Sequence, residues 1–214
     1  MIISHKYKFI FIKTAKTAGT SIEVDLNKIL GDSDISTPIF PPVSGHKPKN
    51  FKQKWPKSLF KKDFGNSHMS ASEVKNIIGN RIFQEYFVFC VEREPVDKCI
   101  SHYSMIRNSP HHNKKTKNIS FDEYILNRKF PIDTDKYVGK NRKLIVNKIL
   151  KYENLQQELN SIGLLLGFNI HLTSNAKTGF REFIEPTNLQ KSIIYKEFEE
   201  SNKHTGYSLM SSNE

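Results

Sequence analysis

Two short apolar segments constrain the fold more than any other feature of this sequence. Residues 7–12 (YKFIFI) and 86–91 (YFVFCV) are almost continuously apolar, and each leads through small or polar residues into a helical pattern. Runs of this kind are typical of strands that are buried on both faces of a parallel sheet. A third strand is expected within residues 144–152. Strands that alternate with helices predict an α/β chain with a central, mainly parallel β-sheet flanked by helices.

Helix signals separate the predicted strands. They are serines followed three residues later by glutamate, a proline suited to a first helical turn, and apolar residues at helical spacing. These signals predict helices over residues 21–30, 71–79, 95–107, 121–129 and 155–166, and a last helix after Pro186. In the last helix, we expect Leu189, Ile193 and Phe198 to face the core.

Residues 31–66 differ in character from the rest of the chain. They contain five prolines and several lysines, and no acidic residue lies between Asp34 and Asp63. We interpret them as a basic, Pro/Lys-rich surface insertion in a single domain that spans residues 1–214. Phe51, Trp55 and Phe60 lie between the lysines and could stack on sugars or on single-stranded nucleic acid, and a solvated surface loop is the alternative.

The composition limits the possible partners and locations of the protein. The net charge of +11 predicts anionic partners such as nucleic acid, phosphorylated cofactors or acidic glycans. Two cysteines, Cys90 and Cys99, are too few to staple a fold of 214 residues. No apolar run approaches the roughly 20 residues that span a bilayer, and lysines interrupt the N-terminal apolar stretch. We therefore expect a cytoplasmic protein without a membrane span.

The segment Lys13–Ser21 (KTAKTAGTS) joins the first predicted strand to the helix that follows. Small residues in such a turn expose successive N–H groups at a helix N-terminus, which makes a site for phosphate. Gly19 allows close approach of a ligand to the backbone, and Lys16 adds a cation. The Gly-x-x-x-x-Gly-Lys-Ser/Thr order of nucleotide triphosphatases is absent. An ordinary capped helix is the alternative interpretation.

A second cluster of polar residues follows the apolar run 86–91. Arg93 comes just after the predicted strand, at the end where α/β sheets bind ligands, and its guanidinium suits a phosphate. Ser101 falls in the second turn of the next helix, near enough to share one anion with Arg93. The alternative is a surface ion pair between Arg93 and an acidic neighbour: Glu92, Glu94 or Asp97.

Together these segments resemble the PAPS-dependent sulfotransferase superfamily, closest to its carbohydrate-type members (sulfotransferase family 2-like) and bacterial relatives. The family's first motif is an apolar strand followed by His-Ile-Pro-Lys-Thr-Ala-Gly-Thr-Ser, and residues 16–21 (KTAGTS) are identical to its end. Residues 93–95 (REP) and 101–103 (SHY) match the second motif, which is Arg, Asn or Asp, and Pro followed by Ser-x-Tyr. Residues 68–71 (HMSA) resemble the segment with a histidine before a helix, and residues 151–155 (KYENL) resemble a later stretch.

The resemblance implies a P-loop-NTPase-like three-layer fold and a sulfotransferase. Such an enzyme transfers a sulfonyl group from 3′-phosphoadenosine 5′-phosphosulfate (PAPS) to a hydroxyl or amine, here expected on a carbohydrate. It leaves adenosine 3′,5′-bisphosphate (PAP) and requires no metal. The implied cofactor-binding residues are Lys16, Thr17, Ala18, Gly19, Thr20, Ser21, Arg93, Ser101 and Lys177. Lys16 would also be catalytic, by stabilising charge on the oxygen that bridges to sulfur.

The sequence departs from the family pattern at three positions. Lys13 and Ala15 replace the usual His and Pro, and Glu94 replaces Asn or Asp. The repeated KTA leaves open whether Lys13 or Lys16 is the main catalytic lysine.

His68 is the expected general base, because an imidazole with a pKa of about 6.5 suits proton abstraction at neutral pH. Glu23 and Glu73 are the alternatives. The pair His111-His112 lacks further ligands at suitable spacing, so we expect no metal site there. Two other functions stay open: a nucleotide-dependent kinase on a related fold, and a non-enzymatic binder of nucleic acid or glycan. For the sulfotransferase itself we expect no nucleic-acid partner.

Overall fold

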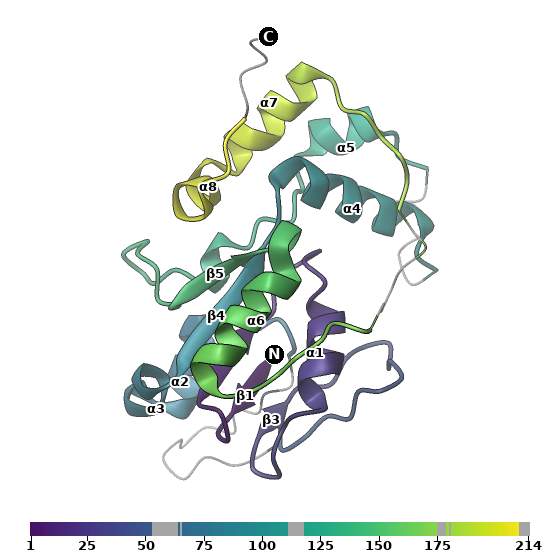
Figure 1. The fold of residues 1–214 in the computed structure, drawn as a ribbon. Helices are drawn as coiled ribbons and strands as arrows, with labels where there is room; N and C mark the ends of the chain where they lie inside the picture. The colour runs from purple at the N-terminus through teal and green to yellow at the C-terminus, as the bar shows by residue number, and fades with distance from the viewer. Residues whose placement is uncertain (53–63, 65, 111–117, 175–178, 180, 210–214) are drawn as a thin grey trace.

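A computed structural model describes residues 1–52, 64, 66–110, 118–174, 179 and 181–209. Its centre is a five-stranded sheet with the strand order β3-β1-β2-β4-β5 (Figure 1). The strands are β1 (Ile2–Ser4), β2 (Phe9–Ile12), β3 (Ile35–Ser36), β4 (Phe87–Glu92) and β5 (Lys148–Lys151). The expectation of an α/β fold with three strands near residues 7–12, 86–91 and 144–152 is confirmed.

The sheet is mixed, so the prediction of a mainly parallel sheet is wrong. Strand β2 pairs in parallel with β4, and β4 pairs in parallel with β5. Strand β1 pairs antiparallel with both β2 and β3. The sequence reading overlooked β1, which is only three residues long. The turn from Ser4 to Phe9 is short, and a connection of this length can join only antiparallel strands.

Part of the segment 31–66 belongs to the sheet and does not lie on the surface as expected. Asp34 is fully buried and accepts hydrogen bonds from the Ser4 hydroxyl and from the backbone N–H groups of His5 and Lys6. This carboxylate ties the β1–β2 turn to the start of β3. A buried acid with several donors is a long-range feature that proline and lysine content does not reveal. Residues 53–63 and 65, with Trp55 and Phe60, lie outside the described residues.

Eight α-helices surround the sheet in the described part of the chain. They are α1 (Gly19–Asn27), α2 (Ala71–Ile78), α3 (Asn80–Glu85), α4 (Pro95–Asn108), α5 (Phe121–Asn127), α6 (Leu155–Leu166), α7 (Asn188–Glu197) and α8 (Glu199–Thr205). The two predicted capping boxes, at Ser70 and Ser120, are confirmed. Pro95 occupies the first turn of α4, as expected. None of the helices in the described ranges has the length and apolarity needed to cross a membrane.

The helices cover both faces of the sheet and one of its ends. One face packs against α1 and α6, through residues such as Ile22 and Leu159. The other face packs against α2 and α3, through residues such as Val74 and Phe83. Helices α4, α5, α7 and α8 gather beyond one end of the sheet (Figure 1). Residues of α4, α5 and α7, together with Phe198, form a third apolar cluster there.

The inward face of the last helical segment differs from the predicted one. Phe198 is buried and Ile193 packs against the third cluster, but Leu189 is 71% exposed. Ile194 is fully buried in its place. Leu189 lies in the first turn of α7, and its side chain stays in solvent.

A buried ion network lies under the end of β4. The ammonium group of Lys98, whose side chain is 0% exposed, lies 2.6 Å from Glu92 Oε2 and 2.9 Å from Asp133 Oδ2. Burial raises the pKa of Glu92 in spite of the nearby Lys98 charge. Burial alone would also raise the pKa of Asp133, but Lys98 and Lys136 outweigh this effect and hold that pKa below its ordinary value. The network therefore joins β4, α4 and the segment at 133–136.

We predict that Lys98→Met destabilises the protein by about 3–5 kcal/mol, because it leaves two buried carboxylates without their shared cation. Urea denaturation followed by circular dichroism measures the change. Lys148→Met is the matched control: Lys148 is half exposed and pairs with Glu158, so its loss is expected to cost less than about 1 kcal/mol. Equal effects of the two substitutions would show that the network adds nothing to stability.

Candidate functional site

A cleft of about 540 Å³ opens at the carboxyl ends of β2 and β4. The expected general base and all of the expected cofactor-binding residues in the described ranges line this cleft: His68, Lys16, Thr17, Ala18, Gly19, Thr20, Ser21, Arg93 and Ser101. Lys177 and the pair His111-His112 lie outside the described residues. Gly179 and Arg181, close to Lys177 in sequence, line the cleft. The structure thus brings both predicted constellations and His68 into one site.

The loop between β2 and α1 has an unusual backbone. Lys16 and Ala18 adopt left-handed conformations, with φ of 60° and 56°. Alternation of this kind turns successive N–H groups to one side and forms a concavity that binds anions. The loop leads directly into α1, which begins at Gly19 and has no acidic residue in its first turn. The helix N-terminus adds partial positive charge at the same place.

Two contacts fix this loop to the rest of the protein. The Thr14 hydroxyl donates to the carbonyl of Val91 in β4 and lies 2.9 Å from the Thr17 hydroxyl. On the other side, the backbone N–H of Ala15 donates to Asp133 Oδ2 at 2.7 Å. The carbonyl of Val91 and the carboxylate of Asp133, which do not line the cleft, therefore hold the loop in place, so its own N–H groups are oriented before any ligand binds.

The two lysines of the loop have different environments. Lys13 is buried, and its ammonium group lies 2.5 Å from Glu23 Oε2 in a buried ion pair. Its side chain passes under Gly19, where an added Cβ would lie 2.8 Å from Lys13 Cγ. Lys16 is only partly buried and lines the cleft. The charge of Lys13 is thus compensated inside the protein, whereas Lys16 lies at the surface of the cleft.

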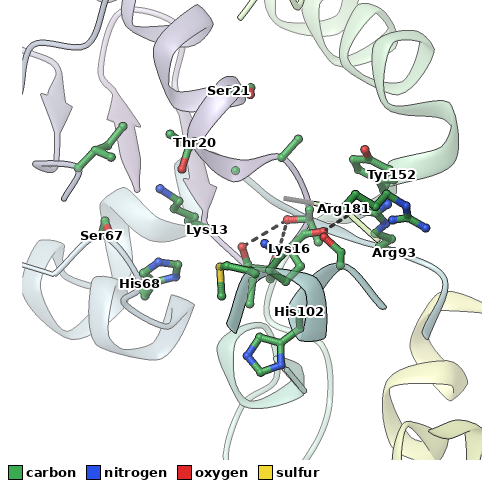
Figure 2. A pocket seen from close by; sticks show the side chains of 18 of the residues that line it. Lys13, Lys16, Thr20, Ser21, Ser67, His68, Arg93, His102, Tyr152 and Arg181 are labelled. Carbon is green, nitrogen blue, oxygen red and sulfur yellow. Dashed lines mark hydrogen bonds between the residues drawn. The ribbon is translucent and has the colours of Figure 1, made fainter. Parts of the chain in front are cut away.

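Arg93 lines the cleft and is held there by three neighbouring groups. Its guanidinium forms an ion pair with Asp97, one of the acidic neighbours named in the sequence analysis. It also donates to the carbonyl of Lys16 at 3.1 Å and lies 4.0 Å from the ring centroid of Tyr152. Arg181 pairs with the other oxygen of Asp97. Figure 2 shows Arg93, Arg181 and Tyr152 together on one side of the loop.

The sequence reasoning missed two of these groups. Tyr152 lies in the KYENL stretch, whose likeness to the family was noted without a role for the ring. Arg181 lies four residues after Lys177, the one residue of this late segment that the sequence analysis considered. The family resemblance pointed to the segment but did not single out Arg181.

His68 lies on the opposite side of the loop from Arg93, next to Ser67 (Figure 2). Burial, together with the charges of Lys136 and Lys13, lowers the pKa of His68 to about 4. The expected pKa near 6.5 is therefore wrong, because the sequence did not reveal the cations around the ring. The closest of them is Lys136, whose Nζ lies 3.5 Å from His68 Nδ1.

Neither alternative base lines the cleft. Glu23 is fully buried and pairs with Lys13. The Glu73 carboxylate accepts hydrogen bonds from the N–H and hydroxyl of Ser70, so it serves as the capping group of α2. The described lining of the cleft includes four lysine or arginine side chains and no Asp or Glu. Such a lining favours an anionic ligand with more than one negative group.

We predict that Gly19→Ala destabilises the protein by about 1–3 kcal/mol, because the added methyl group would press on the buried Lys13 side chain. Thermal or urea unfolding measures the change. Gly31→Ala is the matched control, since its Cβ would meet only ordinary contacts at 3.6 Å or more. If Gly19→Ala is no less stable than Gly31→Ala, the added methyl group does not press on the Lys13 side chain and the prediction is wrong.

Comparison with known proteins identifies the family of the chain. The model of the sulfotransferase family matches residues 1–203, which include every described element of the cleft. The chain is also 30% identical over 126 residues to an uncharacterized protein from Archaeoglobus fulgidus, covering 54% of this chain and 100% of the relative. No solved structure matches the chain. The resemblance seen in the sequence is confirmed, and the chain belongs to the sulfotransferase family.

Proposed function

We propose that the protein transfers a sulfonyl group from PAPS to a hydroxyl or amine of a carbohydrate acceptor. The observation that carries this proposal is the cleft in which the loop at residues 16–21 and the Arg93–Ser101 pair lie together. PAPS has anionic groups at both its 3′ and 5′ positions, so it needs two separate cationic subsites. Membership of the sulfotransferase family supports sulfonyl transfer in general, and the two subsites support this donor in particular.

The donor set of the cleft fits such a molecule. The N–H groups and hydroxyls of residues 17–21, at the N-terminus of α1, would hold the 5′-phosphosulfate. Arg93 and Ser101 would hold the 3′-phosphate, which distinguishes this donor from ATP. The absence of acidic side chains from the described lining fits a polyanion that binds without a bridging metal.

Lys16 is the proposed catalytic lysine. Sulfonyl transfer from PAPS builds negative charge on the oxygen that bridges phosphorus and sulfur. A cation at the surface of the cleft stabilises this charge as it develops, which is usually a large contribution to catalysis. Both lysines line the cleft, but Lys16 is only partly buried, whereas Lys13 is buried in an ion pair with Glu23, so Lys16 is the one proposed for this role.

The acceptor is proposed to enter on the side of His68. Ile39 and Phe40 line the cleft, and the Phe40 side chain is 86% exposed. An aromatic face of this kind offers an apolar surface against which the C–H face of a sugar ring can pack. His68 would then contact the reacting hydroxyl or the sulfonyl oxygens. This surface is compatible with the proposed carbohydrate acceptor.

We predict that PAP binds far more tightly than AMP, and that Arg93→Ala removes most of this preference. Loss of a charge-assisted hydrogen bond is worth about 1.5–3 kcal/mol, or roughly 10- to 100-fold in affinity. Titration calorimetry with PAP, AMP and ATP measures the three affinities. Comparison of PAP with AMP isolates the 3′-phosphate, because any general loosening of the loop at Lys16 weakens both ligands alike.

Two further variants sharpen this test. Ser101→Ala is expected to reduce PAP affinity without touching the loop, and Arg81→Ala, which removes an exposed arginine on α3, is expected to change nothing. Preference for ATP with magnesium would contradict the proposal and favour a kinase. Salt-sensitive binding of nucleic acid that persists after loss of Lys16 and Arg93, without PAP binding, would favour a polymer-binding protein.

We predict that Lys16→Ala lowers kcat by about 100- to 1,000-fold, because the lysine acts on charge that exists mainly in the transition state. Transfer of radiolabelled sulfonyl from PAPS to a mixture of oligosaccharides measures the rate, and calorimetry on the same samples measures PAP affinity. We expect PAP affinity to fall much less than kcat. Full activity in Lys16→Ala would exclude this residue as the catalytic lysine.

A further inference from the structure

The ammonium group of Lys136 lies near two oxygen acceptors and one ring nitrogen of His68. Its Nζ lies 2.6 Å from Asp133 Oδ1, 3.4 Å from the carbonyl oxygen of Lys13 and 3.5 Å from His68 Nδ1. Both Asp133 and Lys136 are largely buried, and Asp133 is held in turn by Lys98. The position of the ammonium group is therefore fixed by the protein, and His68 faces it across the edge of the cleft.

This contact constrains the proton on the imidazole. A lysine ammonium group has only donors, so the ring nitrogen that faces it must supply a lone pair. A neutral imidazole carries one N–H, and which nitrogen carries it is set by the partner of the other. We propose that Lys136, held by Asp133, keeps His68 in the Nε2–H tautomer, so that His68 offers the cleft a hydrogen-bond donor and not a proton acceptor.

The surrounding charges keep the ring neutral, as this role requires. Lys136 and Lys13 act on His68 as cations, and the negative charge of Asp133 opposes them. Burial and these cations hold the pKa of His68 at about 4, so at neutral pH the ring has one N–H and one lone pair. A general base would need its lone pair at Nε2, which would place an N–H at Nδ1 against the ammonium group.

The same carboxylate also positions the anion-binding loop. Asp133 accepts the hydrogen bond from the Ala15 N–H, so one residue orients both that loop and Lys136. Figure 2 shows Lys13 and His68 on the same side of the loop. Asp133 and Lys136 are thus positioning residues, and His68 is the group that meets the ligand. The role of the His68 N–H in catalysis rests on the proposed function, whereas the assignment of the tautomer does not.

The tautomer is tested directly by long-range ¹H–¹⁵N NMR on the histidine-labelled protein, with His68 assigned from the spectrum of His68→Gln. At neutral pH we expect a protonated Nε2 and an unprotonated Nδ1. In Lys136→Met we expect a mixture of tautomers and a rise in the pKa of His68 by about one unit, because a nearby like charge is removed. Lys136→Arg keeps the charge and the donor and is expected to keep the wild-type tautomer.

Lys148→Met is the matched control, since it also removes one lysine charge but from an exposed ion pair outside the cleft lining. It is expected to leave the His68 signals unchanged. A protonated Nδ1 in the wild type would overturn the proposal. An unchanged tautomer and pKa in Lys136→Met, with the fold intact by circular dichroism, would also overturn it.

The donor role is tested by activity of two His68 variants. A glutamine amide can replace the Nε2–H donor but cannot act as a base, whereas leucine can do neither. We expect His68→Gln to keep kcat within about tenfold of the wild type and His68→Leu to lose about 100-fold or more. Equal loss in both variants would overturn the donor role. PAP binding distinguishes failure of the proposed function from failure of the tautomer assignment. If neither the wild type nor the variants bind PAP, the proposed function is wrong, but the NMR result on the tautomer still holds.

Discussion

The parallel pairing of β2 with β4 is the constraint on which the site depends. It sets Phe9 beside Phe87 and Ile12 beside Cys90, so both strands end at the same edge of the sheet. The loop after β2 and Arg93 after β4 therefore meet, and the Arg93 guanidinium reaches the carbonyl of Lys16. Two segments far apart in the chain become one anion-binding cleft because parallel strands present their carboxyl ends together.

A second layer of interactions makes this cleft rigid. Asp133 bonds to the Ala15 N–H and pairs with Lys98 and Lys136, and Asp97 joins Arg93 to Arg181. In each case a carboxylate outside the cleft lining compensates or orients cations and N–H groups near it. The lining itself thus stays cationic, while the charges behind it are balanced. This arrangement suits a site that binds a polyanion, because the buried charges behind the lining are paired and the lining keeps its positive potential.

Much of the fold follows from local patterns. The strands that begin at Phe9 and Phe87 could be predicted because a short apolar run bounded by polar residues is typical of a buried strand. The capping boxes at Ser70 and Ser120 are readable because they involve only residues three positions apart. The site loop was found in the same way, since an anion-binding turn needs small residues in a contiguous stretch. By contrast, β1 and the buried Asp34 owe their places to partners elsewhere in the chain.

The sequence by itself determined the strand–loop–helix units, the cationic loop with Gly19 and the family to which the chain belongs. Only the tertiary structure decided that the sheet is mixed, that Lys13 is neutralised by Glu23, and that His68 lies beside Lys136, 68 residues further along the chain. The physical reason is range. Hydrogen-bonded turns and helical caps are settled between near neighbours, but a pKa or a tautomer depends on every charge that folding brings close.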